Sequence, residues 1–469
     1  MLAFEERAEI DLRIVLIGAG EVGYTVAKNL SSDGHNIIIV EENEERALQA
    51  DSSLDVMVIR GNGARPSVLA RAGINPGCED VDMLIACTNR DEVNLMACWI
   101  ARRMGVRHVI ARAVGLEFTD NDSWAKDLGI DLLISPERTV AREIEELLEV
   151  RAAIHASEIA GGRAGIYVFR IAQDSPLASL SILEARKKTA KKAMLIVCVK
   201  RGDSSFVPKA DDVLQAGDLC YTICYRSEVF EIESFFQPSK SKRLKRVFIV
   251  GAGKIGCQTA QRIMTHIPGV QIRLVDQDRA RCERLAAELP GVMVLCGNGA
   301  DADFMISEGI KTADGYVACT EHDETNLMLS VLAKTLGASK SIAVVRRPFY
   351  LGMTSHIPVD AIVNRNQTLA DVITRCVRYP GSSRMLTVLE EISAEAVEMT
   401  LDEKSPAAGQ TLKDIKMPAG SVVGLLERGG ELFIPGGTTK LEPHDKIVLF
   451  AADTAMRAAM VPFSEAGKK

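Results

Sequence analysis

The chain has 469 residues, of which 25% are charged and 47% are apolar, and its formal net charge is −7. This length exceeds one ordinary hydrophobic core and predicts two to four domains, while the composition excludes wholesale disorder. The acidic balance argues against a nucleic-acid partner, and no apolar run reaches the roughly eighteen residues that a membrane-spanning helix needs.

The N-terminal half begins with a polar stretch and continues with alternating strand and helix signals. Residues 1–11 are an acidic extension that lacks the apolar core of a signal peptide. From residue 12, short apolar runs (VLIGAG, NIIIVE, VMVIRG, MLIACT, HVIARA) alternate with helical segments, which predicts a parallel sheet with helices on both faces over residues 12–135. Residues 136–160 predict a crossover helix and linker, and the short strands of residues 161–236 predict a small α+β module.

A polar, basic linker over residues 237–244 separates this half from a second copy of the same pattern. RIVLIGAGEVG matches RVFIVGAGKIG, GNGA occurs twice, and ACTNRDEVN matches ACTEHDETN, all about 232 to 236 residues apart. The copy predicts a second sheet domain over residues 245–365, a crossover helix and linker over 366–385, and a second module over 386–465. The fold class is therefore α/β, with two Rossmann-like doubly wound domains, each followed by a small α+β domain.

Each predicted sheet domain opens with a G-x-G-x-x-G motif, at Gly18–Gly23 and at Gly251–Gly256. The first glycine makes a tight turn, the second lets a pyrophosphate approach the backbone, and the third lets the helix press on its strand. An acidic residue, Glu41 or Asp276, ends the second strand, where a carboxylate accepts both ribose hydroxyls and favours NAD over NADP. The motifs predict two nucleotide sites; glycine turns kept only for packing are the alternative.

The two motifs differ at the first residue of the predicted helix, which is Glu21 in the first copy and Lys254 in the second. An acid is poorly placed beside extra phosphates, whereas a lysine can pair with one. We therefore expect the first site to prefer a dinucleotide such as NAD(H), and the second to accept ADP or ATP as well.

Further candidates lie at the carboxyl ends of later strands, the edge at which open α/β sheets bind ligands. They are three equivalent pairs: Asn62 and Asn298 after the third strand, Thr88 and Thr320 at the end of the fourth, and Arg112 and Arg346 at the end of the fifth. The asparagines either meet an adenine edge or close a turn, and the arginines either approach phosphates or form surface ion pairs. Asp91 and Asp323 are either ligands or helix-start residues.

No constellation for catalysis or metal binding accompanies these motifs. The eleven cysteines are scattered without a C-x-x-C pair, which indicates reduced thiols, and the seven histidines lack metal-ligand spacing. Without a proton donor or nucleophile arrangement, the pattern favours a sensor that is not an enzyme. The alternatives are an NAD-dependent oxidoreductase, and a sensor that acts on another transporter or on a soluble partner.

The combination of GAGEVG, GNGA and ACTNRDEVN with GAGKIG, GNGA and ACTEHDETN resembles the TrkA family, the regulatory subunits of bacterial Trk potassium-uptake systems. The resemblance runs from about residue 12 to 463 and implies two tandem RCK units, each with a Rossmann part and a smaller C-terminal part. It also implies a cytoplasmic protein, peripheral at the inner face of the membrane, that forms a homotetramer or a dimer of dimers. Its partner would be an integral-membrane Trk-type potassium transporter subunit.

The resemblance further implies NAD(H) as ligand, with ATP or ADP as further candidates at the second site. The implied nucleotide contacts are Gly18, Ala19, Gly20, Glu21, Val22, Gly23, Glu41, Asn62, Cys87 and Thr88 in the first unit, and Gly251, Ala252, Gly253, Lys254, Ile255, Gly256, Asp276, Asn298, Cys319 and Thr320 in the second. Family members often carry an acid where Asn62 and Asn298 stand, which is a departure of this chain from the family pattern.

Overall fold

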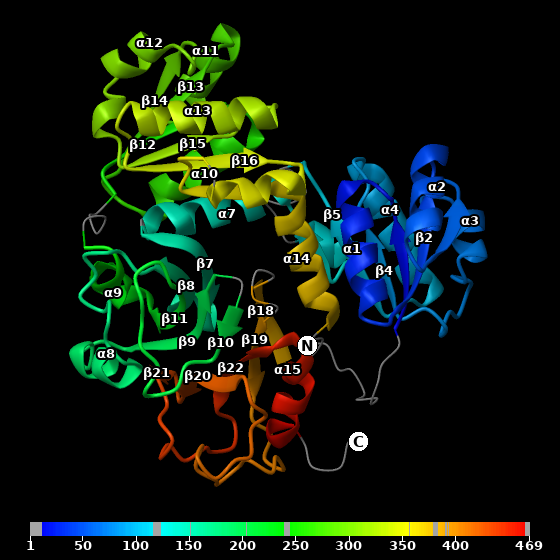
Figure 1. Cartoon of the computed structure of the whole chain (residues 1–469). Helices are drawn as coiled ribbons and strands as arrows, with labels where there is room; N and C mark the ends of the chain where they lie inside the picture. Colours follow the sequence, from blue (N-terminus) through cyan, green and yellow to red (C-terminus); the bar gives the residue numbers. More distant parts are fainter. Residues whose placement is uncertain are drawn as a thin grey trace.

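The computed structural model describes residues 12–115, 123–150, 152–202, 204–238, 244–355, 357–378, 383–389, 392 and 394–464. The predicted N-terminal extension and residues 239–243 of the predicted linker lie outside the described residues. Two parallel sheets and two antiparallel sheets build the molecule, which confirms the fold class (Figure 1).

The first Rossmann domain contains a six-stranded parallel sheet with the order β3-β2-β1-β4-β5-β6. Its strands are β1 (Arg13–Ile17), β2 (Asn36–Glu41), β3 (Met57–Arg60), β4 (Met83–Ala86), β5 (His108–Arg112) and β6 (Leu132–Ile134). Its helices are α1 (Glu21–Ser32), α2 (Glu44–Ser53), α3 (Pro66–Arg71), α4 (Asp91–Met104) and α6 (Ser123–Asp127). The strand order reverses between β1 and β4, so a crevice for ligands lies at the carboxyl ends of these two strands.

The second Rossmann domain repeats this sheet with the order β14-β13-β12-β15-β16-β17. Its strands are β12 (Arg246–Val250), β13 (Gln271–Asp276), β14 (Val292–Cys296), β15 (Gly315–Ala318), β16 (Lys340–Val345) and β17 (Ala361–Asn364). Its helices are α10 (Lys254–His266), α11 (Arg279–Glu288), α12 (Ala302–Ser307) and α13 (Asp323–Thr335). Each predicted strand run is therefore a parallel strand, and both copies place their glycine motifs after the central strand.

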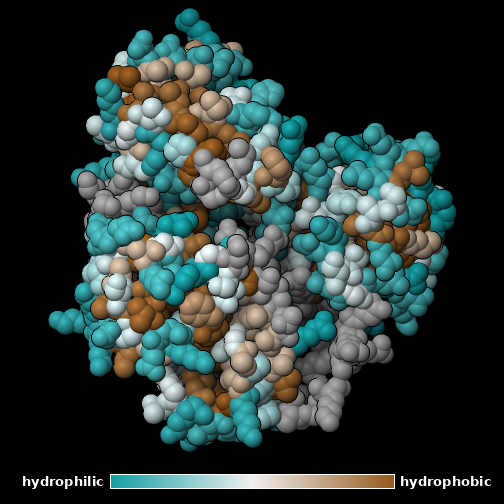
Figure 2. Space-filling view, in the orientation of Figure 1, coloured by the Kyte–Doolittle hydropathy of each residue, from teal (hydrophilic) through white to brown (hydrophobic). Residues whose placement is uncertain are grey.

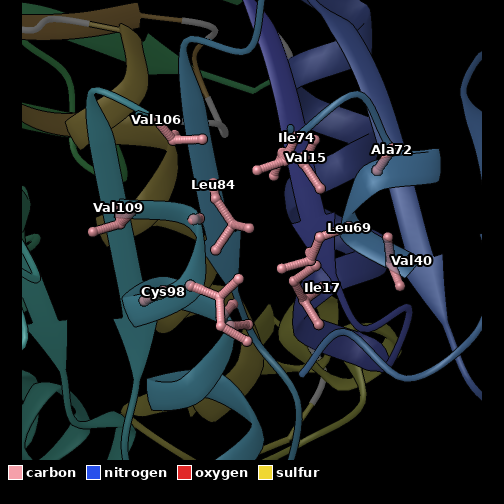
Figure 3. Close-up of a cluster of buried hydrophobic side chains, with 14 of the residues drawn as sticks. Val15, Ile17, Val40, Leu69, Ala72, Ile74, Leu84, Cys98, Val106 and Val109 are labelled. Atoms are coloured by element: carbon pink, nitrogen blue, oxygen red, sulfur yellow. The ribbon is translucent and has the colours of Figure 1, made fainter. Parts of the chain in front are cut away.

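Nearly continuous apolar runs form these strands because helices cover both faces of a parallel sheet. In the first domain, Val15, Ile17 and Leu84 point to one face, where they meet Leu69 of α3 and Cys98 of α4 (Figure 3). The opposite face of the same strands belongs to a separate buried cluster. One sheet thus separates two cores.

The first C-terminal module is a five-stranded antiparallel sheet with the order β10-β9-β11-β8-β7. Its strands are β7 (Ala153–Ile159), β8 (Ala164–Arg170), β9 (Met194–Arg201), β10 (Ser204–Phe206) and β11 (Leu219–Tyr225), with helices α8 (Ile182–Lys188) and α9 (Val229–Phe236). Strand β7 begins inside the segment that the sequence assigns to the crossover helix and linker. The module therefore begins before residue 161.

The second C-terminal module has the corresponding order β18-β19-β22-β20-β21. Its strands are β18 (Ser383–Leu389), β19 (Ala394–Thr400), β20 (Ser421–Arg428), β21 (Glu431–Phe433) and β22 (Lys446–Ala452), followed by helix α15 (Asp453–Met460). Residues of both modules share one buried cluster, so the two sheets pack against each other in the lower part of Figure 1. Short 3-10 turns complete the chain: η1 (Ala160–Gly162), η2 (Arg226–Glu228), η3 (Ile310–Thr312), η4 (Pro348–Ser355) and η6 (Val461–Phe463).

Each C-terminal module contains the same arginine–aspartate ion pair, with the aspartate in the turn before the last strand. Arg201 donates to both carboxylate oxygens of Asp218 at 2.8 and 2.7 Å, and Arg428 does the same to Asp445. The two aspartates are almost fully buried, with 2% and 1% of their surface exposed. Because the pairing is bidentate, it fixes the turn before the last strand.

Each crossover helix packs on the Rossmann domain of the other half of the chain. Helix α7 (Pro136–Glu149) leaves the first Rossmann domain and packs on α10 of the second, and α14 (Arg365–Arg378) leaves the second and packs on α1 of the first (Figure 1). The apolar face of α7 lies in the core of the second sheet, and the apolar face of α14 lies in the core of the first. The halves are therefore interlocked.

Among the described residues, no helix is both long and apolar enough to cross a membrane. The face shown in Figure 2 is mainly hydrophilic, with separate hydrophobic patches over the second Rossmann domain and the C-terminal modules.

Candidate nucleotide sites

The first and third glycines of each motif are required by the fold itself. Gly18 has a φ of +100°, a conformation that other residues rarely adopt. A Cβ on Gly23 would lie 2.0 Å from the carbonyl oxygen of Gly18, and one on Gly256 would lie 2.0 Å from that of Gly251. These two positions admit no side chain, because α1 and α10 press directly on the turns before them.

The second glycine is different, because the protein leaves the space around it empty. A Cβ on Gly20 would meet only the far end of the Arg46 side chain, at 3.9 Å, and one on Gly253 would meet nothing within 4 Å. Both residues have extended backbone with negative φ, which an alanine adopts easily. Packing thus supplies no reason for glycine here, whereas a ligand that approaches the backbone closely does.

The same two glycines stand at the N-cap positions of α1 and α10, and neither helix has a side-chain cap. The first N–H groups of each helix therefore have no intrahelical or capping partner, and the positive end of the helix dipole faces the empty space. This combination suits the phosphates of a nucleotide.

The acidic residues after the second strands hold the glycine turns. The Glu41 carboxylate, which is 7% exposed, accepts hydrogen bonds from the Ala19 N–H at 2.5 Å and the Asn43 N–H at 2.8 Å. In the second copy, the Asp276 carboxylate accepts from the Ala252 N–H at 2.8 Å. Each carboxylate oxygen has a second lone pair for a ribose hydroxyl, so bracing the turn and binding a ribose are compatible.

The environment of Asp276 keeps its carboxylate ionised. Burial alone would raise the pKa of Asp276, but the N–H groups of Asp278 and Ala252 and the Arg281 guanidinium together lower it below the ordinary value. Arg281 contacts this carboxylate at 3.1 Å. The acceptor that the sequence predicts for a ribose is therefore charged at neutral pH.

The segments DEVN (residues 91–94) and DETN (residues 323–326), at the starts of α4 and α13, brace the crevices. Asn94, which is fully buried, accepts hydrogen bonds from the Thr88 N–H and hydroxyl and donates to the carbonyl oxygens of Thr88 and Arg112. Asn326 makes the corresponding contacts with Thr320 and with Val344 in the second copy. The threonine hydroxyls are thus committed to the brace, which fixes the ends of the fourth and fifth strands at each site.

Asp91 and Asp323 support the loop after the fifth strand instead of pointing at a ligand. Asp91 accepts from the N–H groups of Val114 and Gly115 at 2.7 to 3.0 Å, and Asp323 accepts from the Arg346 and Arg347 N–H groups at 3.1 Å. Both also occupy the first turn of their helices. Of the two roles that the sequence left open, the structural one is observed.

The asparagines after the third strand close tight turns. The Asn62 side chain accepts from the Ala64 N–H at 2.9 Å, and the Asn298 side chain accepts from the Ala300 N–H at 3.0 Å. Neither residue has a positive φ, so the turn depends on this side-chain hydrogen bond and not on a left-handed backbone. Their amide groups remain at the edge of the crevice.

Cys87 and Cys319 contribute only their backbone to this edge. The Cys87 thiol is 3% exposed within the core, and burial raises its pKa to about 12; Cys319 is buried in the same way, with a pKa also raised to about 12. Neither thiol is positioned to touch a nucleotide.

The two arginines at the ends of the fifth strands are not equivalent, because Arg112 is the last residue of β5 and Arg346 follows β16. Arg112 is half-buried, and its pKa is lowered first by burial and then by the nearby positive charge of Arg365 at the start of α14. Its Nε has no hydrogen-bond partner. Arg346 is 53% exposed and lies 3.5 Å from Asp323, so the surface ion pair that the sequence allowed is present only in the second copy.

The residue at the helix start also differs in its surroundings. The Glu21 carboxylate accepts a hydrogen bond from the Asn366 side chain, which belongs to the first turn of α14. Lys254 is exposed. The first site is therefore in direct contact with a crossover helix that comes from the other half of the chain.

Sequence reasoning missed one pair of basic residues at the sites, Arg46 and Arg281. Both lie in the first turn of the helix after the acidic residue, and each is five residues beyond it in EENEER and DQDRAR. Arg46 is the side chain nearest to the open space over Gly20, and Arg281 contacts Asp276. Their equal positions in the repeat were the signal that could have identified them.

The described residues contain no group suited to holding a metal ion. A charged cluster does lie where α7 meets the first C-terminal module, with Arg226 bonded to Glu149 and Glu158. Burial is the largest factor that raises the pKa of the neighbouring Glu146, to about 8. This cluster joins two domains and is separate from the nucleotide sites.

Comparisons with known proteins identify the family of the chain. Residues 14–136 and 247–365 match the TrkA-N domain, and residues 396–463 match the TrkA-C domain. A Trk system potassium uptake protein TrkA homolog of Archaeoglobus fulgidus is 32% identical over 441 residues, which cover 94% of this chain and 97% of that protein. The TrkA protein of Vibrio alginolyticus is 28% identical over 446 residues, covering 94% and 95% of the two chains.

Solved structures show the same fold. A structure of the GsuK channel bound to NAD superposes with a TM-score of 0.60 at 18% identity, covering 99% of this chain and 81% of that one. The GsuK RCK domain superposes with a TM-score of 0.59, also at 18% identity, covering 98% and 96%. The two relatives named here are Trk system potassium uptake proteins. With both Rossmann domains and the second C-terminal module matched, the chain belongs to the TrkA family.

Proposed function

We propose that the chain is a nucleotide-sensing regulatory subunit that gates a Trk-type potassium transporter in the membrane. The observation that carries this proposal is the open space over Gly20 and Gly253, each at the uncapped start of a long helix. The family membership supports the potassium-transport context. The ligands would be NAD(H) at both sites, with ADP or ATP as further candidates at the second, where Lys254 replaces Glu21.

The contact between the first site and α14 suggests how binding is transmitted. A phosphate near the start of α1 competes with the Glu21 carboxylate for the same positive helix end. Moving Glu21 would break its bond to Asn366, and α14 continues directly to strand β18 of the second C-terminal module. Nucleotide binding would thereby favour one arrangement of the C-terminal modules over another.

A ligand shifts such an equilibrium only by its differential affinity for the two arrangements, and a nearly complete switch needs about 5.5 kcal/mol. Several sites in a symmetric oligomer can share this requirement. We therefore propose a homotetramer, or a dimer of dimers, that docks on the cytoplasmic face of an integral-membrane transporter subunit.

The test is to fill the open space over each second glycine. Gly20→Ala and Gly253→Ala should fold normally, because nothing in the protein lies within 3.5 Å of either new Cβ, yet each should weaken nucleotide binding at its own site. Gly436→Ala, at a position with equal space in the second C-terminal module, is the matched control. Nucleotide binding is measured by calorimetry. Potassium flux is measured in cells that co-express a Trk-type membrane subunit.

Loss of binding in each variant with unchanged circular dichroism would support the proposal. Nucleotide affinity at wild-type levels in both variants would contradict it, since the ligand would then not approach these backbones. Turnover of a nicotinamide cofactor by the wild-type protein would instead support the oxidoreductase alternative.

A further inference from the structure

Two cysteine thiols meet at the acidic end of the second nucleotide site. Cys282 lies in the first turn of α11, and its Sγ is 3.4 Å from the carbonyl oxygen of Asp276. Cys296 ends β14, and its Sγ is 3.9 Å from the carbonyl oxygen of the next residue, Gln277. The α11 helix and β14 lie side by side at the edge of the second sheet (Figure 1). Both sulfur atoms therefore lie beside the same two-residue segment of backbone, Asp276 and Gln277.

The two thiols lie close enough for Cys296 to affect the ionisation of Cys282. Burial, and after it the charge and the hydrogen bond of the Cys296 thiol, raise the pKa of the Cys282 thiol to about 11. Cys282 is 5% exposed, whereas Cys296 is exposed to solvent. An exposed thiol with a buried thiol against it is the arrangement in which the first can react with a small oxidant and the second can resolve the product.

The first nucleotide site lacks this feature. The positions equivalent to Cys282 and Cys296 in the repeat are Ala47 and Arg60, and Arg60 pairs with Glu44 at 3.0 Å. The thiol pair is therefore not a general requirement of the fold, because the same helix and strand pack in the first domain without it.

We propose that Cys282 and Cys296 are a modification site, at which a low-molecular-weight disulfide such as glutathione disulfide converts the two thiols into an intramolecular disulfide that weakens nucleotide binding at the second site. The Cys296 thiolate attacks one sulfur of glutathione disulfide, forms a mixed disulfide and releases one glutathione. The Cys282 thiolate then attacks the Sγ of Cys296 and releases the second glutathione. Two thiols are oxidised, one disulfide is reduced, and the two protons go to the two glutathione thiols.

The second step becomes easier once the first has occurred. The Cys296 thiol is one of the groups that disfavour ionisation of Cys282, and in the mixed disulfide it no longer carries a charge or a proton. The attack on Cys296 also needs little movement, because both sulfur atoms already lie against the carbonyl oxygens of the adjacent residues Asp276 and Gln277.

The effect on binding rests on the proposed function and follows from what lies beside the two cysteines. Arg281 precedes Cys282 and holds the Asp276 carboxylate, and Asn298 lies two residues beyond Cys296. A disulfide draws the sulfur atoms together to about 2.05 Å, which pulls the first turn of α11 towards β14. The ribose acceptor and its arginine then leave the geometry of the reduced protein.

The first experiment detects the bond itself in the full chain. Reduced protein is incubated with glutathione disulfide, digested without reduction and analysed by mass spectrometry, where we expect a Cys282–Cys296 cross-linked peptide pair. The Cys282→Ala variant should stop at the glutathione adduct on Cys296, and Cys257→Ala, which removes a half-buried thiol elsewhere in the domain, should still form the cross-link. Wild-type protein that accumulates the adduct on Cys296 without the cross-link would overturn the proposal.

The second experiment measures NADH affinity by calorimetry in the Gly20→Ala variant, so that only the second site binds. We expect oxidation to weaken binding about tenfold, dithiothreitol to restore it, and Cys296→Ser to bind equally with and without oxidant. Equal affinity before and after complete cross-linking would refute the effect on binding. Absence of binding even in the reduced variant would refute the proposed function of this site. The cross-link would remain established in that case, because mass spectrometry detects it independently of binding.

Discussion

Lys340 is the most informative single residue to replace, because it joins the two halves from a fully buried position. It stands at the start of β16 with 1% of its surface exposed, and its ammonium donates to the carbonyl oxygens of Leu147, Val150 and Ala153 at 2.5, 3.1 and 2.7 Å. These carbonyls end α7 and begin β7 in the first half of the chain. The cation therefore caps the crossover helix at its negative end.

Lys340→Met keeps an unbranched side chain that is one atom shorter and removes the donors. The Leu147 and Ala153 carbonyls lose this donor at about 1 to 3 kcal/mol each, or about 2 to 6 kcal/mol together, and the relief from burying an ammonium offsets part of that cost. The Val150 carbonyl also accepts from the Ala153 N–H, so it is not left without a partner. We expect a net local destabilisation of about 2 to 4 kcal/mol.

A global unfolding free energy is poorly defined for a chain of several domains, so the assay is hydrogen exchange of the amides in the last turn of α7. The expected destabilisation corresponds to exchange that is about 30-fold to several hundred-fold faster. Lys334→Met is the matched control, because that side chain is 23% exposed and pairs with Asp360 near the surface. Exchange within threefold of wild type, or equal acceleration in both variants, would refute the reasoning.

Three further predictions concern charged groups. The pKa of Glu146 is raised from an ordinary value of 4.5 to about 8, so the folded protein holds a proton that the unfolded chain releases. The free energy of unfolding should therefore fall as pH rises from about 5 to 8, and Glu146→Gln should abolish this pH dependence in thermal melts. Glu21→Lys removes the bond to Asn366 and should raise ATP affinity at the first site in calorimetry; unchanged selectivity would contradict the role given to this residue. Asp218→Asn breaks the bidentate pair with Arg201 and should destabilise the first C-terminal module by about 2 to 3 kcal/mol, seen as faster exchange in β11; exchange as in wild type would show that the pair is dispensable.

The parts of the fold that could be predicted from sequence are those set by local chemistry. The glycine turns, the strand runs and the acidic strand ends occur within about 30 residues of one another in each copy, so their pattern determines a Rossmann unit almost alone. The duplication repeats this pattern in the second half of the chain, which supports the same fold prediction a second time. This is why both parallel sheets of the structure agree with the predicted fold class.

The partners of the crossover helices could not be predicted in this way. The apolar face of α7 shows that the helix packs on something, but the two Rossmann sheets are near copies and offer nearly equivalent surfaces. The choice between them depends on the whole chain. A hydrophobic pattern identifies a buried face and does not identify what buries it.

The same distinction between local patterns and contacts of the folded chain applies to individual site residues. Asn62 was expected at an adenine edge or in a turn, and only the folded loop shows its hydrogen bond to the Ala64 N–H. Arg112 was expected near phosphates or in an ion pair, and its burial beside Arg365 depends on a residue more than 250 positions away. Contacts across that distance leave no trace in a local motif.

The exchange of crossover helices also has a consequence for how the protein is made. While the chain emerges from the ribosome, α1 leaves an apolar face that only α14 covers, and α14 follows some 330 residues later. At synthesis rates of about 5 to 20 residues per second, this face waits roughly 17 to 70 s for its partner. Slower synthesis would lengthen this interval, and a chain truncated before α14 would leave the same apolar face of α1 without the residues that cover it in the full-length protein.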